Sequence, residues 1–193
     1  KGLLGKVVVV DFWTYSCINC IRTFPALKAL HERYAAQGLV IVGVHSPEFA
    51  FEKKLENLKK AVAEHGLKYP IFQDNDFKTW RAYRNQYWPA KYIIDKKGNA
   101  RYTHFGEGAY EETEQVIKYL LTEGKNVEKE VDFSTVEKGM EGIQTPETYL
   151  GIARRENYRP SGDPKTLSSN EWSLSGEWDE DEEKVVSETS ESS

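Results

Sequence analysis

The sequence predicts an α/β fold, in which a central mixed β-sheet is flanked by helices and followed by a short C-terminal β-rich extension. Three observations support this class. Runs of β-branched residues alternate with helical patterns, a hairpin pattern closes the series, and apolar residues become sparse after about residue 124. Strands separated by helices favour parallel pairing with right-handed crossovers, whereas the closing hairpin adds antiparallel strands.

Strands are expected at five places. Residues 6–13 contain four consecutive valines, and residues 39–44 read Leu-Val-Ile-Val-Gly-Val. Continuous apolar runs of this kind are typical of strands that are buried on both faces of a sheet. Shorter strands are expected at 69–72, 91–94 and 101–105. The turn residues between the last two predict that they form a hairpin.

Four helices are expected between and after these strands. The first begins near Cys17, ends at Gly38 and contains Pro25, which is expected to kink it. The second, at 51–65, has its apolar residues on one face, as an amphipathic surface helix requires. The remaining helices are expected at 76–84 and 110–122.

The chain is expected to divide into three parts. Residues 1–124 form the α/β domain, residues 125–144 are a mostly polar linker, and residues 145–193 are a C-terminal extension. Within the extension, residues 172–178 alternate in the way of a β-strand. So few apolar positions cannot bury a sizeable core alone. The extension therefore either packs on the first domain or begins a β-domain that the chain does not complete.

Charge and hydropathy argue against nucleic-acid binding and against a membrane-spanning helix within this sequence. The net charge is −5, and the last 17 residues hold eight acids against one lysine, which leaves +2 on the other 176 residues. Without a basic stripe there is little support for nucleic-acid binding. No apolar run approaches the roughly 20 residues of a membrane span. Because the chain opens directly before a strand, we interpret it as an excised or mature fragment whose targeting or membrane segment lay upstream.

The two cysteines carry the main chemical signal. Cys17 and Cys20 lie two residues apart, where the first strand is expected to pass into the first helix. Free amides and the helix dipole at that end stabilise a thiolate, so the pKa of Cys17 is expected below its usual value of about 8.5. Cys17 is then the exposed nucleophile and Cys20, one turn later, the buried resolving thiol. A Cys-x-x-Cys in a βαβ setting predicts a redox centre.

Other uses of the cysteines are less favoured. Zinc would need two further ligands at a workable spacing, and the four histidines are scattered over different elements. Two incidental buried cysteines do not suit the polar setting that Ser16 and Asn19 provide. A peroxidase would need a Pro/Thr/Arg setting that is not found near Cys17.

Several motifs resemble one protein family. Residues 10–20, followed by Pro25, resemble the active-site stretch of the thioredoxin superfamily, and more narrowly that of the TlpA-like redoxins. The motifs at 12–20, 43–48, 83–90 and 105–108 are similar to the C-terminal thioredoxin region of DipZ-type proteins. Residues 145–151 resemble the segment that leads into a carbohydrate-binding-like β-sandwich there, and we expect residues 145–193 to be the truncated start of such a module. The resemblance covers 1–124 and implies a thioredoxin fold.

The resemblance also implies roles for several residues. Asp11 matches the buried acid that exchanges protons with the resolving cysteine; an Asp at the surface end of a strand is the alternative. Pro89 matches the cis-proline that faces the disulfide and holds substrate backbone, and an ordinary trans proline is the alternative. Trp88 would shape the substrate surface, unless it is a core residue.

Four further residues are expected close to the cysteines. Glu107 is a candidate catalytic residue, but a solvated loop Glu is the favoured interpretation. Trp13 and Tyr15 flank the centre and are expected to wall the substrate site. Arg22 could aid thiolate formation, but a solvated helix Arg is the favoured interpretation. Ile18 and Asn19 replace the Gly-Pro of ordinary thioredoxin, which leaves the redox direction open.

The resemblance implies an extracytoplasmic thiol–disulfide oxidoreductase, acting as a reductase of protein disulfides. A membrane electron carrier of the CcdA/DsbD type would recharge it, and the full-length protein would be tethered in the periplasm or at the cell surface. The resemblance implies that the Cys17–Cys20 disulfide is the redox centre and that the enzyme needs no cofactor and no metal. Its substrates would be protein thiols and disulfides. The alternative is a binding module, in which residues 145–193 recognise a glycan or a protein and the first domain is a scaffold.

Overall fold

The computed structural model describes residues 2–122, 133, 147–160 and 165–187. The chain separates into two compact units, Lys1–Gly139 and Met140–Ser193. The linker expected over 125–144 lies outside the described residues, apart from Phe133, which packs against Tyr110.

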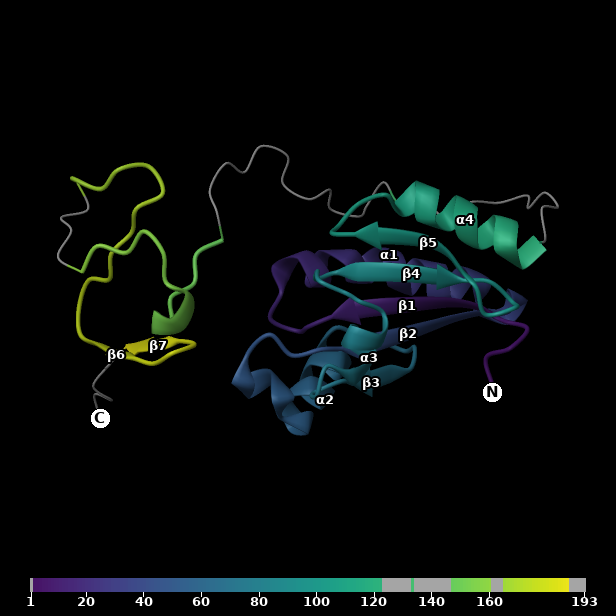
Figure 1. Ribbon diagram of the computed structural model, residues 1–193, viewed down its shortest axis with the longest axis horizontal. Coiled ribbons are helices and arrows are strands. Elements are labelled where there is room, and N and C mark those ends of the chain that lie inside the picture. The colour runs from purple at the N-terminus through teal and green to yellow at the C-terminus, as the bar shows by residue number, and fades with distance from the viewer. Residues whose placement is uncertain (1, 123–132, 134–146, 161–164, 188–193) are drawn as a thin grey trace. The chain divides into compact units, whose positions relative to one another are not determined.

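A five-stranded mixed sheet forms the centre of the first unit (Figure 1). Its strands are β1 (Val7–Trp13), β2 (Leu39–His45), β3 (Ile71–Gln73), β4 (Ala90–Ile94) and β5 (Ala100–Phe105). They lie in the order β3-β2-β1-β4-β5. The pairs β1–β2 and β2–β3 are parallel, whereas β1–β4 and β4–β5 are antiparallel. The expected mixed sheet is thus confirmed, although β3 begins two residues later than expected.

Among the described residues, four α-helices accompany the sheet: α1 (Ile18–Tyr34), α2 (Leu55–Glu64), α3 (Lys78–Ala82) and α4 (Tyr110–Thr122). The 3-10 turn η1 (Ala35–Gln37) follows α1 and leads into Gly38, whose φ of 104° ends the helical segment. The range of α4 is the expected one, and Pro25 lies inside α1 as expected.

Two expected helices are shorter in the structure. The helix expected at 51–65 is interrupted because Lys54 is extended (φ −74°, ψ 117°), which leaves a 3-10 turn, η2 (Ala50–Lys53), before α2. The helix expected at 76–84 is reduced to α3 because Phe77 and Arg84 have φ of 55° and 52°. A left-handed residue cannot continue a right-handed helix, and sequence periodicity does not reveal it.

The core lies on both faces of β1, whose seven residues are all buried. On one face, Val7 and Val9 belong to a large apolar cluster that includes side chains of α1 and α4. On the other face, Val8, Val10 and Phe12 form a smaller cluster with Trp80 of α3. Alternate residues of an extended strand point to opposite faces. The unbroken valine run therefore contributes to both clusters.

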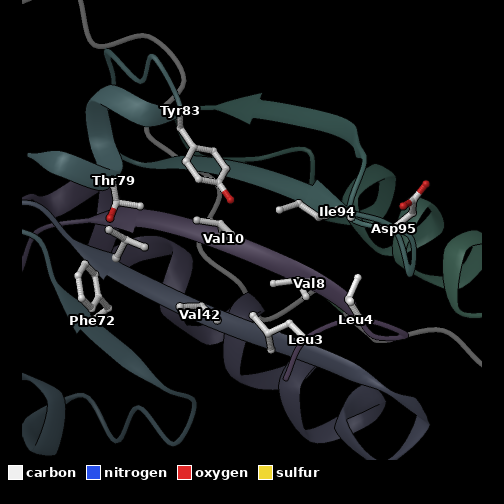
Figure 2. Close-up of a pocket in the computed structure, with 12 residues that line it drawn as sticks. Leu3, Leu4, Val8, Val10, Val42, Phe72, Thr79, Tyr83, Ile94 and Asp95 are labelled. Carbon is white, nitrogen blue, oxygen red and sulfur yellow. The ribbon is translucent and has the colours of Figure 1, made fainter. Parts of the chain in front are cut away.

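The face with the smaller cluster is partly open. A groove of about 480 Å³ crosses it, lined by valines of β1 and β2. Figure 2 shows Val8, Val10 and Val42 among the lining residues. The N-terminal residues Leu3 and Leu4 lie along one side, and Phe72, which is half exposed, lies on another. The short helix α3 therefore leaves part of this face uncovered.

The second unit contains a small two-stranded antiparallel sheet of β6 (Trp178–Glu180) and β7 (Val185–Ser187), and a 3-10 turn, η3 (Ile152–Arg154). The strand expected at 172–178 is not formed as such, because only its two ends pair: Trp172 forms a single bridge with Tyr158, and Trp178 begins β6 opposite Ser187. Gly176 bends the chain with a φ of 105°, and the strand begins two residues later. The alternating pattern was therefore a poor guide to the strand's position.

Gly43 allows a close approach at the centre of the first unit, so we expect Gly43→Ala to destabilise it. A Cβ there would lie 2.7 Å from Ile71 Cδ1 and 2.8 Å from Trp13 Nε1. Overpacking of this kind costs about 1–3 kcal/mol of unfolding free energy, which urea unfolding would measure. Gly2→Ala, where a Cβ meets nothing within 4 Å, is the control. Equal stability of the two variants would contradict the close approach.

Candidate functional site

The two cysteines lie where β1 passes into α1. Cys17 is the N-cap of α1, with extended backbone (φ −78°, ψ 112°), and Cys20 lies in the first helical turn. The Cys20 amide donates a hydrogen bond to Cys17 Sγ at 3.4 Å. The thiols are not joined to each other, which corresponds to the reduced centre. A sulfur at the N-cap faces the unpaired amides of the helix end, as an anion would.

The two thiols have unequal environments. The hydrogen bond from the Cys20 thiol lowers the pKa of Cys17 most, and the amides of Cys20 and Asn19 add to it, against burial and the charge of Glu48. Cys20 is 0% exposed, and burial raises its pKa well above the usual value, with further contributions from Cys17. Cys17 is therefore the accessible thiolate and Cys20 the protected thiol.

Asp11 is fully buried in β1 and faces a buried lysine. Its register partner on β4 is Lys91, whose Nζ lies 3.5 Å from Asp11 Oδ1. Burial raises the pKa of Asp11 to about 6, and the charge of Lys91 opposes that rise. The charge of Asp11 in turn contributes to the raised pKa of Cys20. The buried position excludes the alternative of a surface Asp at the strand end.

The Trp88–Pro89 peptide bond is cis, as the resemblance implied. Pro89 is buried, and its carbonyl accepts a hydrogen bond of 2.8 Å from the Gly106 amide. Trp88 is half-buried: its indole donates to the Ser46 carbonyl at 3.0 Å, and its ring packs 4.3 Å from that of Trp80. Trp88 thus has one side in the fold and some surface left for a substrate.

Glu107 and Arg22 form an ion pair instead of facing solvent. Arg22 Nη1 lies 3.4 Å from Glu107 Oε1, with side-chain exposures of 18% and 16%. The expectation that Arg22 and Glu107 are solvated side chains is therefore wrong for both residues. Among the interactions of the described residues, none joins Glu107 to either cysteine. The pair links α1 to the loop between β5 and α4.

The two aromatic residues before Cys17 differ in exposure. Trp13 is 1% exposed and packs edge-on against Phe24 and His45. It has no surface with which to bind a substrate, so its expected binding role is wrong and it supports the site from the core. Tyr15 is partly exposed, stacks on His45 and donates a hydrogen bond to the Phe51 carbonyl at 3.1 Å.

Sequence reasoning missed three buried polar residues near the site. Lys91 had a weak signal, since it stands among the apolar residues of a predicted strand. His45 lies in the motif at 43–48, which gave it no role, and Glu52 had no signal, although it is 0% exposed and reaches the turn before Cys17. Burial lowers the pKa of His45 to about 4, so the ring is neutral at pH 7.

The described residues contain neither a metal-binding cluster nor a membrane-spanning helix. Among them, no group of three or more His, Cys, Asp and Glu side chains is arranged to hold a metal ion. Within the same part of the chain, each helix is too short or too polar to cross a membrane. The redox chemistry of the site resides in its own two sulfurs.

We expect iodoacetamide to modify Cys17 at least about tenfold faster than Cys20 at pH 7. The reason is that Cys17 combines a lowered pKa with partial exposure, whereas Cys20 is buried with a raised pKa. Mass spectrometry of the reduced protein after timed quenching would give both rates. Comparable rates would contradict the unequal roles.

We expect Lys91→Met to raise the pKa of Asp11 from about 6, because the opposing charge is removed. The folded chain holds the Asp11 proton more tightly than the unfolded chain. The stability that this proton contributes is therefore lost as the pH rises through about 6 in the wild type, and at higher pH in the variant. The ¹³C shift of the Asp11 carboxyl would report the titration. Lys59→Met, at an exposed position, is the control.

Comparison with known proteins places the chain in a family. Residues 1–103 match the AhpC/TSA family. The chain is 41% identical over 191 residues to protein DipZ of Mycobacterium tuberculosis, covering 92% of this chain but 28% of DipZ. It is 32% identical over 124 residues to the thiol-disulfide oxidoreductase YkuV of Bacillus subtilis, covering 64% of this chain and 83% of YkuV. The chain thus spans under a third of the length of DipZ.

Solved structures agree with this relationship. A thiol:disulfide interchange protein DsbE from Chlorobium tepidum superposes with a TM-score of 0.57 at 27% identity, covering 62% of this chain and 83% of that one. A thiol-disulfide isomerase from Corynebacterium glutamicum gives 0.58 at 26% identity, with the same coverage. Together with the geometry of Cys17 and Cys20, these similarities show that the chain belongs to the AhpC/TSA family and is a thiol–disulfide oxidoreductase of thioredoxin-like fold.

Proposed function

We propose that this oxidoreductase reduces protein disulfides outside the cytoplasm and is recharged by a membrane electron carrier of the CcdA/DsbD type. The observation that carries the reaction is the unequal dithiol: an accessible Cys17 with a lowered pKa, next to a buried Cys20 with a raised one. A reductase needs such a pair, because one sulfur must attack an external disulfide while the other stays protonated until it resolves the mixed disulfide.

The reaction proceeds in two exchange steps. The Cys17 thiolate attacks one sulfur of the substrate disulfide, forms a mixed disulfide and releases the other substrate sulfur as a thiolate, which takes up a proton. Cys20 then loses its proton and attacks Cys17 Sγ, forming the Cys17–Cys20 disulfide and releasing the second substrate thiolate. Two electrons thus pass from the dithiol to the substrate, and an external dithiol must return them.

Three nearby residues have proposed roles in these steps. Asp11 is the acceptor of the Cys20 proton, which its raised pKa near 6 suits, since a carboxylate at neutral pH can then bind a proton transiently. Pro89, with Trp88 before it, holds the substrate backbone beside Cys17. Glu107 acts through its ion pair with Arg22, which fixes the loop after β5 against α1, and is a positioning residue.

The location and the electron donor rest on the relatives. Similarity to DipZ and to a DsbE protein supports a place outside the cytoplasm, where disulfides form and persist. A membrane carrier is the donor class that such a compartment requires, because cytoplasmic reductants do not reach it. The domain division at 124 and 145 is part of the same proposal, with the C-terminal extension outside the reacting unit.

A glycan-binding role for the second unit is the alternative. The observation in its favour is an aromatic pair, Tyr158 and Trp172, in a polar segment. However, the two rings lie 4.7 Å apart, and the Arg155 guanidinium lies over the Tyr158 ring at 4.1 Å. Two rings in mutual contact, one of them also covered by a guanidinium, leave less ring surface for a sugar, so this cluster is better explained as packing within the unit.

We expect Cys17→Ser to abolish the reduction of insulin disulfides, and Cys20→Ser to accumulate a mixed disulfide with the substrate, because the resolving attack is lost. Turbidity and non-reducing gels would measure the two effects. The reduction potential of the wild type, set against glutathione, tests the direction. A potential near about −120 mV, typical of a strong oxidant, would contradict a reductase.

A further inference from the structure

We propose that Glu52 positions the turn that presents Cys17 against the cis-Pro89 loop, and so determines how fast the dithiol engages a disulfide substrate. Glu52 lies in η2, outside every motif that pointed to the redox centre, and its carboxylate contacts neither cysteine sulfur among the described interactions. It is a positioning residue for the reaction proposed above, and the inference rests on that reaction.

One oxygen of the Glu52 carboxylate holds the turn before Cys17. Oε1 accepts hydrogen bonds from the Thr14 hydroxyl, from the Ser16 amide at 3.2 Å and from the Ser16 hydroxyl at 2.6 Å. The Cys17 amide in turn donates to the Thr14 carbonyl at 3.4 Å. The position of this turn therefore fixes where Cys17 Sγ stands at the end of α1.

The other oxygen holds the segment to which Glu52 itself belongs, residues 46–52. Oε2 accepts hydrogen bonds from the Glu48 and Phe49 amides, the latter at 2.9 Å. This 46–52 segment also reaches the substrate side of the site, because the Ser46 carbonyl accepts from the Trp88 indole at 3.0 Å. A single carboxylate thus connects the Cys17 turn with the residue that precedes Pro89.

The energetics require a carboxylate at this position. A buried carboxylate is costly unless donors surround it, and Glu52, 0% exposed, receives five. An ionised carboxylate only accepts, with both oxygens, whereas a glutamine amide accepts with one oxygen and donates from its nitrogen. Glu52→Gln keeps the volume but must leave the donors on one side unpaired, and so loosens one side of the connection.

The test compares two reactions of Cys17 in Glu52→Gln and in the wild type. Each protein is assayed on the plateau of its own pH profile, where Cys17 is fully thiolate, so that a change in the pKa of Cys17 does not affect the comparison. Alkylation by iodoacetamide needs only the thiolate. Exchange with a disulfide-bonded peptide also needs the Cys17 turn and the Pro89 loop in register. Glu56→Gln, on the exposed face of α2, is the matched control.

We expect alkylation of Glu52→Gln to stay within about twofold of the wild type, while peptide exchange slows at least about tenfold, in the range that small misplacements of reacting groups cost. Glu56→Gln should leave both rates unchanged. Peptide exchange at the wild-type rate would overturn the proposal. So would an equal change in both reactions, because that is the mark of general destabilisation.

Ser16→Ala provides a second variant should Glu52→Gln fail to fold. It removes one donor to Oε1 at an exposed position and leaves the carboxylate otherwise paired. We expect it to slow peptide exchange about threefold without altering alkylation, and no change would overturn the proposal. If the wild type itself exchanges no faster than Cys17→Ser, the proposed function fails. If the wild type exchanges faster than Cys17→Ser, and Glu52→Gln exchanges at the wild-type rate, only the inference about Glu52 fails.

Discussion

The placement of β1 in the middle of the sheet is the constraint on which the rest of the site depends. Paired with β2 on one side and β4 on the other, its seven residues are all buried. A strand held in this way cannot shift register without moving its side chains to the wrong face. Its C-terminal end is therefore a rigid base, and the turn that follows delivers Cys17 to the start of α1.

Burying so much of β1 creates a problem for the polar groups that the chemistry requires. Asp11 is fully buried, and Lys91 on the neighbouring strand partly offsets the cost of its charge. Glu52 solves the same problem differently, with neutral donors from two loops instead of a cation. Isolated buried charges cost far more than the stability of a domain, so each needs its own partners. Asp11 lies in β1, and Glu52 binds the turn between β1 and α1.

Much of the fold was predictable because it is written in local patterns. The valine run of β1, the apolar run of β2 and the helical pattern at 110–122 each predicted an element that the structure contains. The helix boundaries were predicted wrongly where the backbone conformation of a single residue ends or interrupts the helix. Phe77 and Arg84 take left-handed conformations that shorten α3, and Lys54 interrupts the helix before α2. A helical pattern of side chains continues through such residues although the backbone does not.

The sequence alone determined the redox pair, since two cysteines separated by two residues at a strand–helix junction have few other uses. It also indicated Asp11 and Pro89, because their positions match those of functional residues in the thioredoxin superfamily. Only the tertiary structure paired Asp11 with Lys91, joined Arg22 to Glu107, moved Trp13 into the core and brought Glu52 to the turn before Cys17. The physical reason is distance along the chain. Contacts such as the one between Ser16 and Glu52, 36 residues apart, form only when the sheet brings its loops together, and no local pattern encodes them.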